Sequence, residues 1–219
     1  MLIGTPTKYG AGMELMGDFW DLSNLHKTIH RIVSGSRMNQ KVGDFILGLA
    51  YEIKYAYQGM REDRPMGTSV LDTVNYKGVK LLWPWLLFQT ALLRWSASFQ
   101  PTTKEDQADL YRLEHCVERS LIMYEPQIAR ECMQWLSSFP GVPDDYLFEY
   151  ATEVGYQYVF GGGKVGKSRF KKLPDALYAL TILNPSYKQF EWYIAGLARQ
   201  KGCRVEDLVD LSLWPNFKW

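Results

Sequence analysis

One segment restricts the fold of this chain more than any other: WPWLLFQTALLRW, residues 83–95, in which apolar side chains are not confined to one face. A helix that is apolar nearly all round must be enclosed by other elements. Pro84 is tolerated in its first turn, where the missing N–H would have no partner. Polar residues such as Arg94 interrupt the apolar run, which is too short for the roughly 20 residues of a membrane span. We therefore expect residues 84–99 to form a central, buried helix.

Helical spacing also dominates the rest of the chain. In TTKEDQADLYRLEHCVERSL, Thr103 and Asp106 resemble a capping box, and Leu110, Leu113, Val117, Leu121 and Tyr124 recur at helical intervals. Pro126 ends this helix and begins another. Two further helices are expected where apolar stripes run over 22–33 and 42–56, the first capped by Asp21 or Ser23. Another helix is expected to begin near Asp144 or Asp145. The last helices are expected within 172–183 and 184–202, with a short one at 205–213.

Two short stretches favour β-structure instead. Residues 1–19 are rich in glycine and β-formers, which predicts a hairpin joined near Tyr9 and Gly10. The segment VLDTVNYKGVKLL, residues 70–82, predicts a second small hairpin with its turn at 75–78, preceded by a polar connector. The expected fold is mainly α, a multi-helix bundle of about seven or eight helices with a small N-terminal β-hairpin. No connector is long enough for a linker, so residues 1–219 are expected to form a single domain.

Composition sets wider limits. Apolar residues make up 47% of the chain and aromatic residues 15%, enough for a packed core, which excludes a disordered protein. A net charge of +1 argues against a protein built wholly around nucleic acid or an acidic membrane. The three cysteines lie far apart without a C-x-x-C pair, and the N-terminus lacks the pattern of a signal peptide. These features predict a cytosolic protein with reduced thiols that does not enter a membrane.

The letters of a P-loop occur in VFGGGKVGKSRF, residues 159–170, where Gly161 is followed after four residues by Gly166, Lys167 and Ser168. A working P-loop needs a buried strand before it and a helix after it. Residues 156–160 are the only candidate for the strand, and Pro174 would break the helix early. A flexible connector is the simplest interpretation. A P-loop NTPase and a simpler phosphate or polyanion contact remain as alternatives.

The polyanion alternative rests on charge. Five cationic residues lie within nine positions, with no acidic residue until Asp175: Lys164, Lys167, Arg169, Lys171 and Lys172. Glycines let a backbone approach an anion and direct N–H groups toward it. The candidate ligand-binding residues are therefore Gly161, Gly163, Lys164, Gly166, Lys167, Ser168, Arg169 and Lys171. Four nearby aromatic residues are candidates for stacking on a base: Tyr156, Tyr158, Phe170 and Tyr178.

Other candidate chemistry is weaker. His26 and His30 share a helix face, as two metal ligands would, but no third ligand is evident and no metal site or cofactor is expected. No nucleophile motif is present, so no catalytic residue is assigned. Asp106 and Asp109 are better explained as a helix cap and a solvated face than as an acid/base pair. The aromatic C-terminal segment, residues 212–219, is expected to dock on the body or on a second subunit.

Three stretches carry a resemblance to known proteins: GDFWDLSNLHKTIHRI, WPWLLFQTALLRW and DQADLYRLEHCVE. Together they resemble an uncharacterised family of bacterial proteins of about this length. The resemblance implies a bacterial or phage cytosolic origin and supplies no activity or functional residues. The leading expectation is a non-enzymatic binding or interaction protein with a protein partner or self-association. The alternative is a binder of a nucleotide or nucleic acid through residues 161–172, extending to weak nucleotide hydrolysis.

Overall fold

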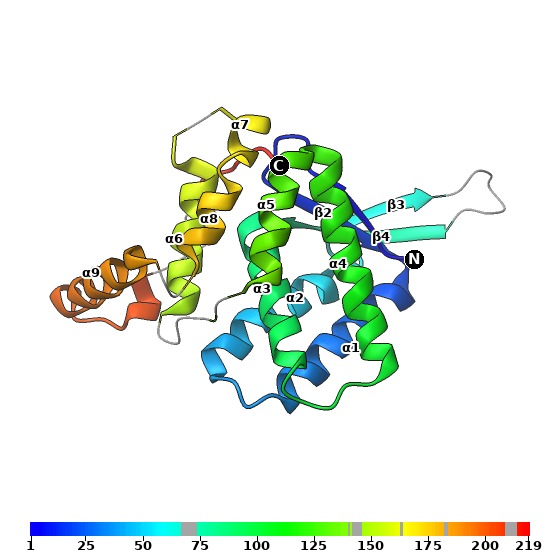
Figure 1. Cartoon of the computed structure of the whole chain (residues 1–219), viewed down its shortest axis with the longest axis horizontal. Helices are drawn as coiled ribbons and strands as arrows, with labels where there is room; N and C mark the ends of the chain where they lie inside the picture. The colour runs from blue at the N-terminus through cyan, green and yellow to red at the C-terminus, as the bar shows by residue number, and fades with distance from the viewer. Residues whose placement is uncertain (67–73, 140, 142–145, 163, 182–183, 209–213) are drawn as a thin grey trace.

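The computed structural model describes residues 1–66, 74–139, 141, 146–162, 164–181, 184–208 and 214–219, and it is mainly α, as predicted (Figure 1). The strands are β1 (Ile3–Pro6), β2 (Gly12–Gly17), β3 (Glu62–Met66) and β4 (Val74–Leu82). The first helices are α1 (Phe19–Gly35), α2 (Gln40–Tyr57), α3 (Trp83–Ala97), α4 (Lys104–Tyr124) and α5 (Pro126–Ser137). They are followed by α6 (Leu147–Phe160), α7 (Lys167–Phe170), α8 (Leu173–Ala179), α9 (Pro185–Lys201) and a 3₁₀ turn, Val205–Leu208.

The four strands form one antiparallel sheet in the order β1-β2-β4-β3. In Figure 1, α4 and α5 lie in front of the sheet, and the β3–β4 hairpin extends away from the body. Helix α4 packs along β1, and α2 packs against β4. Met13 and Leu15 on the central strand β2 are fully buried, as is nearly all of Val79 on β4. The sheet is therefore part of the core rather than an appendage to the helices.

The predicted N-terminal hairpin is confirmed. Strands β1 and β2 pair from Ile3 with Met16 to Pro6 with Met13. Between them, the N–H of Thr7 donates to Gly12 at 2.8 Å, and Gly10 adopts a φ of 71°, where a side chain would be strained. The tight turn at residues 7–12 therefore depends on the glycine that the sequence places there.

The second predicted hairpin is wrong in its turn. Residues 75–78 lie inside the continuous strand β4, and β3 occupies part of the stretch predicted to be a polar connector. Gly78 permits close strand approach rather than a turn, because a Cβ there would lie 2.8 Å from Cγ of Met16. The polar strand β3 is stabilised by ion pairs across the sheet, such as Glu62 with Lys80 at 2.7 Å. Residues 67–73, between β3 and β4 in the sequence, lie outside the described residues.

The central placement of α3 is confirmed. Twelve of its residues are buried, among them Leu86, Leu87 and Phe88 with no exposed surface. Pro84 stands in the first turn, as predicted. The helix ends at Ala97, slightly before the predicted end, and Phe99 beyond it is exposed.

Helix boundaries follow their caps. Thr103 and Asp106 form the predicted capping box of α4, and Pro126 begins α5. The cap of α1 is Asp18 rather than Asp21 or Ser23: Asp18 accepts the N–H of Asp21, and Asp21 accepts the N–H of Asp18. Asp21 is therefore the second partner of a capping box that begins three residues earlier.

The C-terminal third adds a lobe to this body. Helices α6 and α8 pack on each other and on α3, and α9 projects from the side of the molecule (Figure 1). A small second cluster of Ile194, Ala198 and Val205 lies under α9, separate from the main core. Gly202 ends α9 at a φ of 64°, as the sequence predicts.

The single domain spanning 1–219 stays a prediction. Among the described helices, none combines the length and the apolar character that crossing a bilayer requires.

Candidate functional site

The segment with the P-loop letters follows a helix, not a strand. Residues 156–160 are the last part of α6, and they do not belong to the sheet, which is antiparallel throughout. The helix that follows the letters, α7, is a single turn of four residues. A P-loop is delivered by a buried strand and opens a full helix. The elements on either side of the letters are therefore not those that a P-loop requires.

The glycine N–H groups of this segment are directed at protein carbonyls. Gly161 and Gly162 donate to carbonyls of α6 at 2.8 and 2.6 Å, and Gly166 donates to the carbonyl of Tyr9 at 2.8 Å. The expectation that these glycines direct N–H groups toward an anion is therefore wrong for Gly161, Gly162 and Gly166. Gly163 lies outside the described residues.

Arg169 was a candidate ligand-binding residue, but the structure buries it, with 5% of its surface exposed. Its Nη1 donates to the carbonyls of Lys218 at 2.7 Å and Tyr9 at 3.2 Å, and its Nη2 donates to Val159 at 3.5 Å. Burial lowers the pKa of its guanidinium group from the usual value. Arg169 therefore joins three remote segments and has no free face for a ligand.

Two of the lysines are also engaged. Lys172 donates from Nζ to the carbonyls of Gly161, at 3.2 Å, and Gly162, at the C-terminal end of α6. Lys167 forms an exposed ion pair with Glu125 at 3.1 Å. Because exposed ion pairs contribute about 0–1 kcal/mol, Lys167 can exchange this partner for a ligand at little cost.

The remaining candidates are open to solvent. Lys164, Ser168 and Lys171 are exposed, and their side chains make no hydrogen bond or ion pair with the described part of the chain. Of the candidate ligand residues, these three and Lys167 are therefore the ones whose side chains can reach a bound anion.

The structure adds two lysines that the sequence did not predict. The N–H of Tyr9 in the β1–β2 turn donates to the carbonyl oxygen of Trp219 at 2.9 Å, so the C-terminal segment lies beside this turn. The Nζ atoms of Lys8 and Lys218 lie 5.4 and 5.6 Å from the centre of the Tyr9 ring. The N–H of Gly166 donates to the carbonyl of Tyr9 at 2.8 Å, so the segment that carries the exposed Lys164, Lys167 and Lys171 also meets this turn. We call these five exposed lysines, together with Tyr9, the basic surface. The expected docking of the C-terminal segment was the only signal that could have placed Lys218 there.

A cavity that adjoins the basic surface, among the described residues, is too small for a phosphate ion. It has a volume of about 10 Å³ and lies beside Gly161, Arg169 and Lys172. This volume accommodates about one water molecule. An anion would therefore contact lysine side chains on the surface and would not be enclosed.

The four aromatic residues proposed for base stacking lie in different environments. Phe170 is fully buried, and Tyr158 is buried with its hydroxyl donating to the carbonyl of Gly10 at 2.5 Å. Tyr156 packs against Phe160, and Tyr178 is exposed on α8. Tyr9, which was not proposed for stacking, has Lys8 and Lys218 beside its ring.

The predicted docking of the C-terminal segment is confirmed for residues 214–219. The ring of Trp214 lies 5.7 Å from the ring centres of both Trp85 and Tyr156, and Phe217 and Trp219 also pack on the main core. Residues 212–213 fall outside the described part of the chain.

The histidine pair lies at the interface of α1 and α2. The ring centres of His26 and His30 are 4.5 Å apart, and Nε2 of His26 is buried without a hydrogen-bond partner. Burial, followed by the nearby charges of His30, Lys54 and Lys27, lowers the pKa of His26. Within the described ranges, no group of three or more His, Cys, Asp or Glu side chains is placed to hold a metal ion.

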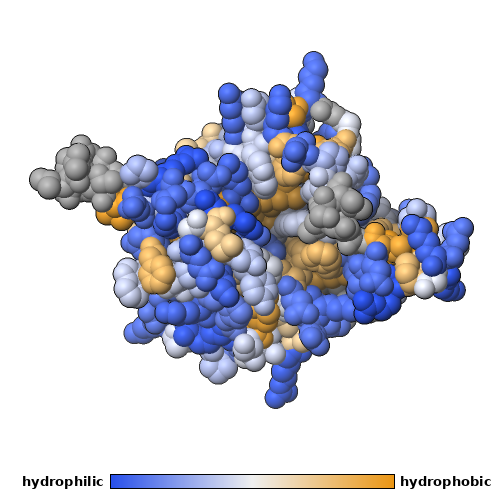
Figure 2. Space-filling view, turned by 180° about the vertical axis from the view of Figure 1, so that it is seen from behind, coloured by the Kyte–Doolittle hydropathy of each residue, from blue (hydrophilic) through white to orange (hydrophobic). Residues whose placement is uncertain are grey.

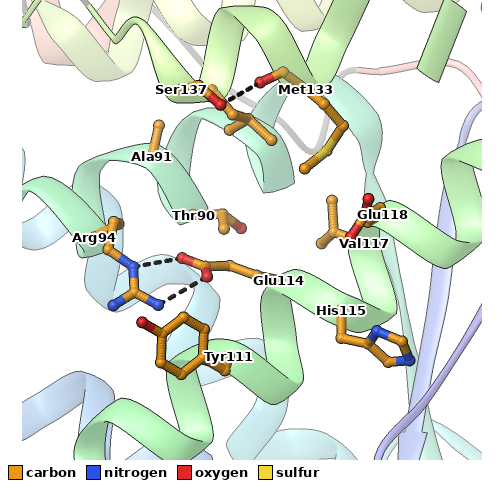
Figure 3. A pocket seen from close by; sticks show the side chains of 11 residues that line it. Thr90, Ala91, Arg94, Tyr111, Glu114, His115, Val117, Glu118, Met133 and Ser137 are labelled. Atoms are coloured by element: carbon orange, nitrogen blue, oxygen red, sulfur yellow. Dashed lines mark hydrogen bonds and ion pairs between the residues drawn. The ribbon is translucent and has the colours of Figure 1, made fainter. Parts of the chain in front are cut away.

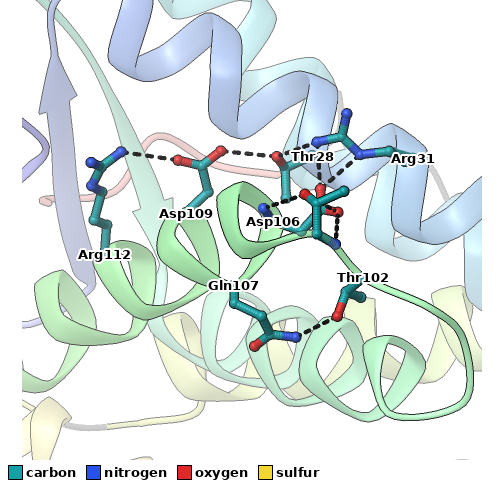
Figure 4. A network of polar contacts seen from close by, with 8 residues as sticks. Thr28, Arg31, Thr102, Asp106, Gln107, Asp109 and Arg112 are labelled. Carbon is teal, nitrogen blue, oxygen red and sulfur yellow. Dashed lines mark hydrogen bonds and ion pairs between the residues drawn. The ribbon is translucent and has the colours of Figure 1, made fainter.

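The paired carboxylates belong to a polar network between α1 and α4 (Figure 4). Asp106 completes the capping box of α4, as predicted, and accepts from Arg31 Nε at 2.7 Å. Asp109, predicted to lie on a solvated face, is buried and accepts from Thr28 at 2.9 Å and from Arg112 at 3.2 Å. Both carboxylates are engaged in joining helices.

Larger cavities than the one beside Arg169 lie elsewhere in the described part of the chain. One of about 540 Å³ lies between α3, α4 and α5, where Arg94 forms a two-pronged ion pair with Glu114 (Figure 3). One of about 650 Å³ lies between α6, α8 and α9. On the opposite face of the molecule from Figure 1, hydrophobic residues line a central hollow (Figure 2). Two adjoining cavities, of about 350 and 290 Å³, share Leu82, Trp85 and Trp219 as lining residues.

Comparison with known proteins places the chain in a family. Residues 2–219 match the model of a domain of unknown function, DUF6904. The chain belongs to the DUF6904 family. No curated protein and no solved structure matches it. The match extends over almost the whole chain, so the basic surface, the α9 lobe and the C-terminal segment all lie within the family's domain.

Proposed function

We propose that this DUF6904 chain is a non-enzymatic cytosolic binding protein of bacterial or phage origin that binds a polyanion, a single-stranded nucleic acid, on its basic surface. The observation that carries the proposal is the convergence of three remote segments on Tyr9. The β1–β2 turn contributes Lys8, the segment after α6 contributes Lys164, Lys167 and Lys171, and the C-terminal segment contributes Lys218.

Flexible lysines around an aromatic ring suit a single strand. Lysine side chains track phosphates, and an aromatic ring offers a stacking surface to any base. Glu125 is the acidic side chain that contacts this group, through its exposed ion pair with Lys167. The site differs from the expected phosphate loop, because the contacts come from side chains rather than from glycine N–H groups.

The cytosolic assignment rests on the thiols. Burial raises the pKa of the Cys116 thiol to about 11 and that of Cys132 to about 12. Thiols with such raised pKa values are poor nucleophiles and resist oxidation. This agrees with a protein that keeps its cysteines reduced.

Fluorescence anisotropy with a short labelled oligothymidylate tests the proposal. We expect affinity to fall steeply with salt, and the combined variant Lys164→Ala, Lys167→Ala and Lys171→Ala to reduce the slope of log K against log salt by about 2, since each phosphate contact to a single strand contributes about 0.7. Arg169 is kept, because its loss would destabilise the fold.

The matched control removes the same charge elsewhere. Lys104, Lys188 and Lys201 are exposed on α4 and α9, away from the basic surface. Their combined replacement by alanine should leave the slope almost unchanged. Equal loss in both triple variants, no binding by the unaltered protein, or tighter binding of poly-glutamate than of the oligonucleotide would contradict the proposal.

A second candidate function is protein interaction or self-association through α1 and α2. Exposed aromatic and apolar side chains lie on these helices and just beyond: Phe19, Trp20, Tyr51, Tyr55 and Met60. Ring contacts connect Phe19 with Tyr51 through Tyr57, His26 and His30. Exposed apolar groups of this kind mark interaction sites. Light scattering over a concentration series should show self-association that Trp20→Ser removes and Trp192→Ser does not, and a monomer at every concentration would contradict self-association.

A further inference from the structure

The cavity between α6, α8 and α9 is built from one stripe of each helix. Helix α6 contributes Tyr150, Glu153, Val154 and Gln157, α8 contributes Asp175, Ala176 and Ala179, and α9 contributes Gln189, Phe190 and Tyr193. Its volume of about 650 Å³ lies within the usual range for small-molecule sites, which combine apolar walls with a few polar groups. Neither Tyr9 nor any lysine of the basic surface is among the residues that line the cavity, so the inference below does not rest on the proposed function.

The walls offer ring surfaces rather than hydroxyl donors. The rings of Tyr150 and Phe190 lie 5.1 Å apart, and the Tyr150 hydroxyl already donates to the carbonyl of Ala179 at 3.0 Å. Tyr193 is 60% exposed at the edge of the cavity, although it is a large apolar ring. Aromatic faces carry negative electrostatic potential and attract cations that lie over them.

The charges in the cavity favour the same kind of ligand. The carboxylates of Glu153 and Asp175 have no ion-pair partner in the described ranges; Glu153 accepts a hydrogen bond from Gln157 at 2.8 Å. Lys172, at one end, is directed at the carbonyls of Gly161 and Gly162, where the C-terminal end of α6 is itself partly negative. Within the described ranges, Glu153 and Asp175 therefore have no ion-pair partner, whereas the ammonium group of Lys172 is engaged by carbonyl oxygens.

We propose that the α6–α8–α9 cavity binds an organic cation, an amine or quaternary ammonium attached to an aromatic or other apolar group. The apolar group lies against Tyr150 and Phe190, Tyr193 covers it from α9, and the ammonium group lies between Glu153 and Asp175. This arrangement supplies the carboxylates with the charge that they lack and removes exposed ring surface from water.

Three probes of one shape test the assignment by isothermal titration calorimetry: 4-phenylbutylammonium, 4-phenylbutanol and 4-phenylbutyrate. We expect the ammonium to bind tightest and the butyrate weakest. The double variant Glu153→Gln, Asp175→Asn should reduce the preference for the ammonium over the alcohol by about three- to tenfold. It should leave the melting temperature unchanged, because both carboxylates are exposed.

Two tyrosine variants, one inside the cavity and one outside it, test whether the ammonium probe binds in this cavity. Tyr193→Ala should weaken the binding of the ammonium, whereas Tyr178→Ala should not, because Tyr178 is 58% exposed on α8 but does not line the cavity. Three results would overturn the proposal: no binding of any probe, a preference for the butyrate, which would assign the cavity to anions held by Lys172, or a preference for the ammonium that survives the double variant.

Discussion

The guanidinium group of Arg169 donates a hydrogen bond to the carbonyl oxygen of Lys218 at 2.7 Å, although 49 positions separate the two residues in the sequence. The same Nη1 atom reaches the carbonyl of Tyr9 in the β1–β2 turn. One buried cation therefore joins the first hairpin, the segment after α6 and the C-terminal segment. The basic surface exists because this contact brings its three parts together.

Replacing Arg169 by alanine should destabilise the fold. The change removes the hydrogen bonds from Arg169 Nη1 to the carbonyl oxygens of Lys218 and Tyr9, of which Tyr9 keeps the N–H of Gly166 as a donor, and we expect a cost of roughly 1–3 kcal/mol of the free energy of unfolding. Arg169→Lys should recover part of this loss, because an ammonium group cannot reproduce the planar fork of the guanidinium. Urea unfolding measures both values, and Lys164→Ala serves as the control from the same segment. Equal stability of Arg169→Ala and Lys164→Ala would show that Arg169 is dispensable.

The docked C-terminal segment should contribute to stability through its rings. Trp214 packs on Trp85 and Phe160, and its burial is partial. Trp214→Ala should therefore cost about 1.5–3 kcal/mol, the value for burying a large apolar side chain.

Trp192 is the matched control for this measurement, because it is 78% exposed on α9. Trp192→Ala should leave the melting temperature within about 1 °C, since surface substitutions change stability little. A thermal scan in which the two variants melt together would contradict the docking of the C-terminal segment.

The sequence predicted the elements whose signals are local. The apolar stripes of α1 and α2, the capping box of α4 at Thr103 and the all-round apolar helix α3 each carry their evidence within a few turns. Strand β3 carries no such evidence. Its first three residues, Glu62, Asp63 and Arg64, are charged, and it is held as a strand by partners such as Lys77 and Lys80 across the sheet.

The candidate site was predicted only in part, because some of its contacts join residues that are far apart in the sequence. The letters around Gly161 and Lys167 gave the position of a cationic segment, and Lys164, Lys167 and Lys171 in it are exposed. Nothing local distinguishes Arg169 from its lysine neighbours, because its acceptors Tyr9 and Lys218 lie far away in the chain. Long-range contacts also bring Lys8 to the surface that these lysines form.

Stability should fall as the pH is lowered from 7 toward 5, and His26 should contribute to this change. Its pKa in the fold lies below the usual value, so the unfolded chain takes up a proton first as the pH falls. The contribution is complete above pH of about 6.5 and is lost below it, toward the lowered pKa. Replacing His26 by glutamine should flatten the pH dependence of the unfolding free energy in this range, whereas His115→Gln on α4 should not. An unchanged slope in His26→Gln would exclude His26 as its source.

At more acidic pH, Asp106 should dominate the loss of stability at the junction of α1 and α4. Burial alone would raise the pKa of this carboxyl, but hydrogen bonds from Thr103 and Arg31 and the charge of Arg31 outweigh it and hold the pKa below the usual value. A depressed pKa means that the stabilisation is present above pH of about 4 and is lost as the pH falls through the folded value.

Asp106→Asn tests this assignment near neutral pH and in acid. The amide keeps the size of the side chain but loses the charge opposite Arg31, and it can still accept one of the N–H bonds of the cap. We expect a loss of about 1–2 kcal/mol at neutral pH, typical of a weakened cap, and a difference from the unaltered protein that shrinks as the pH falls through the lowered pKa of the native carboxyl, because that carboxyl then becomes neutral as well. Asp175→Asn, on the exposed side of α8, provides the matched control and should change neither value. A deficit of Asp106→Asn that stays constant down to the lowest pH would mean that the asparagine disrupts packing, and that the charge of Asp106 does not stabilise the junction.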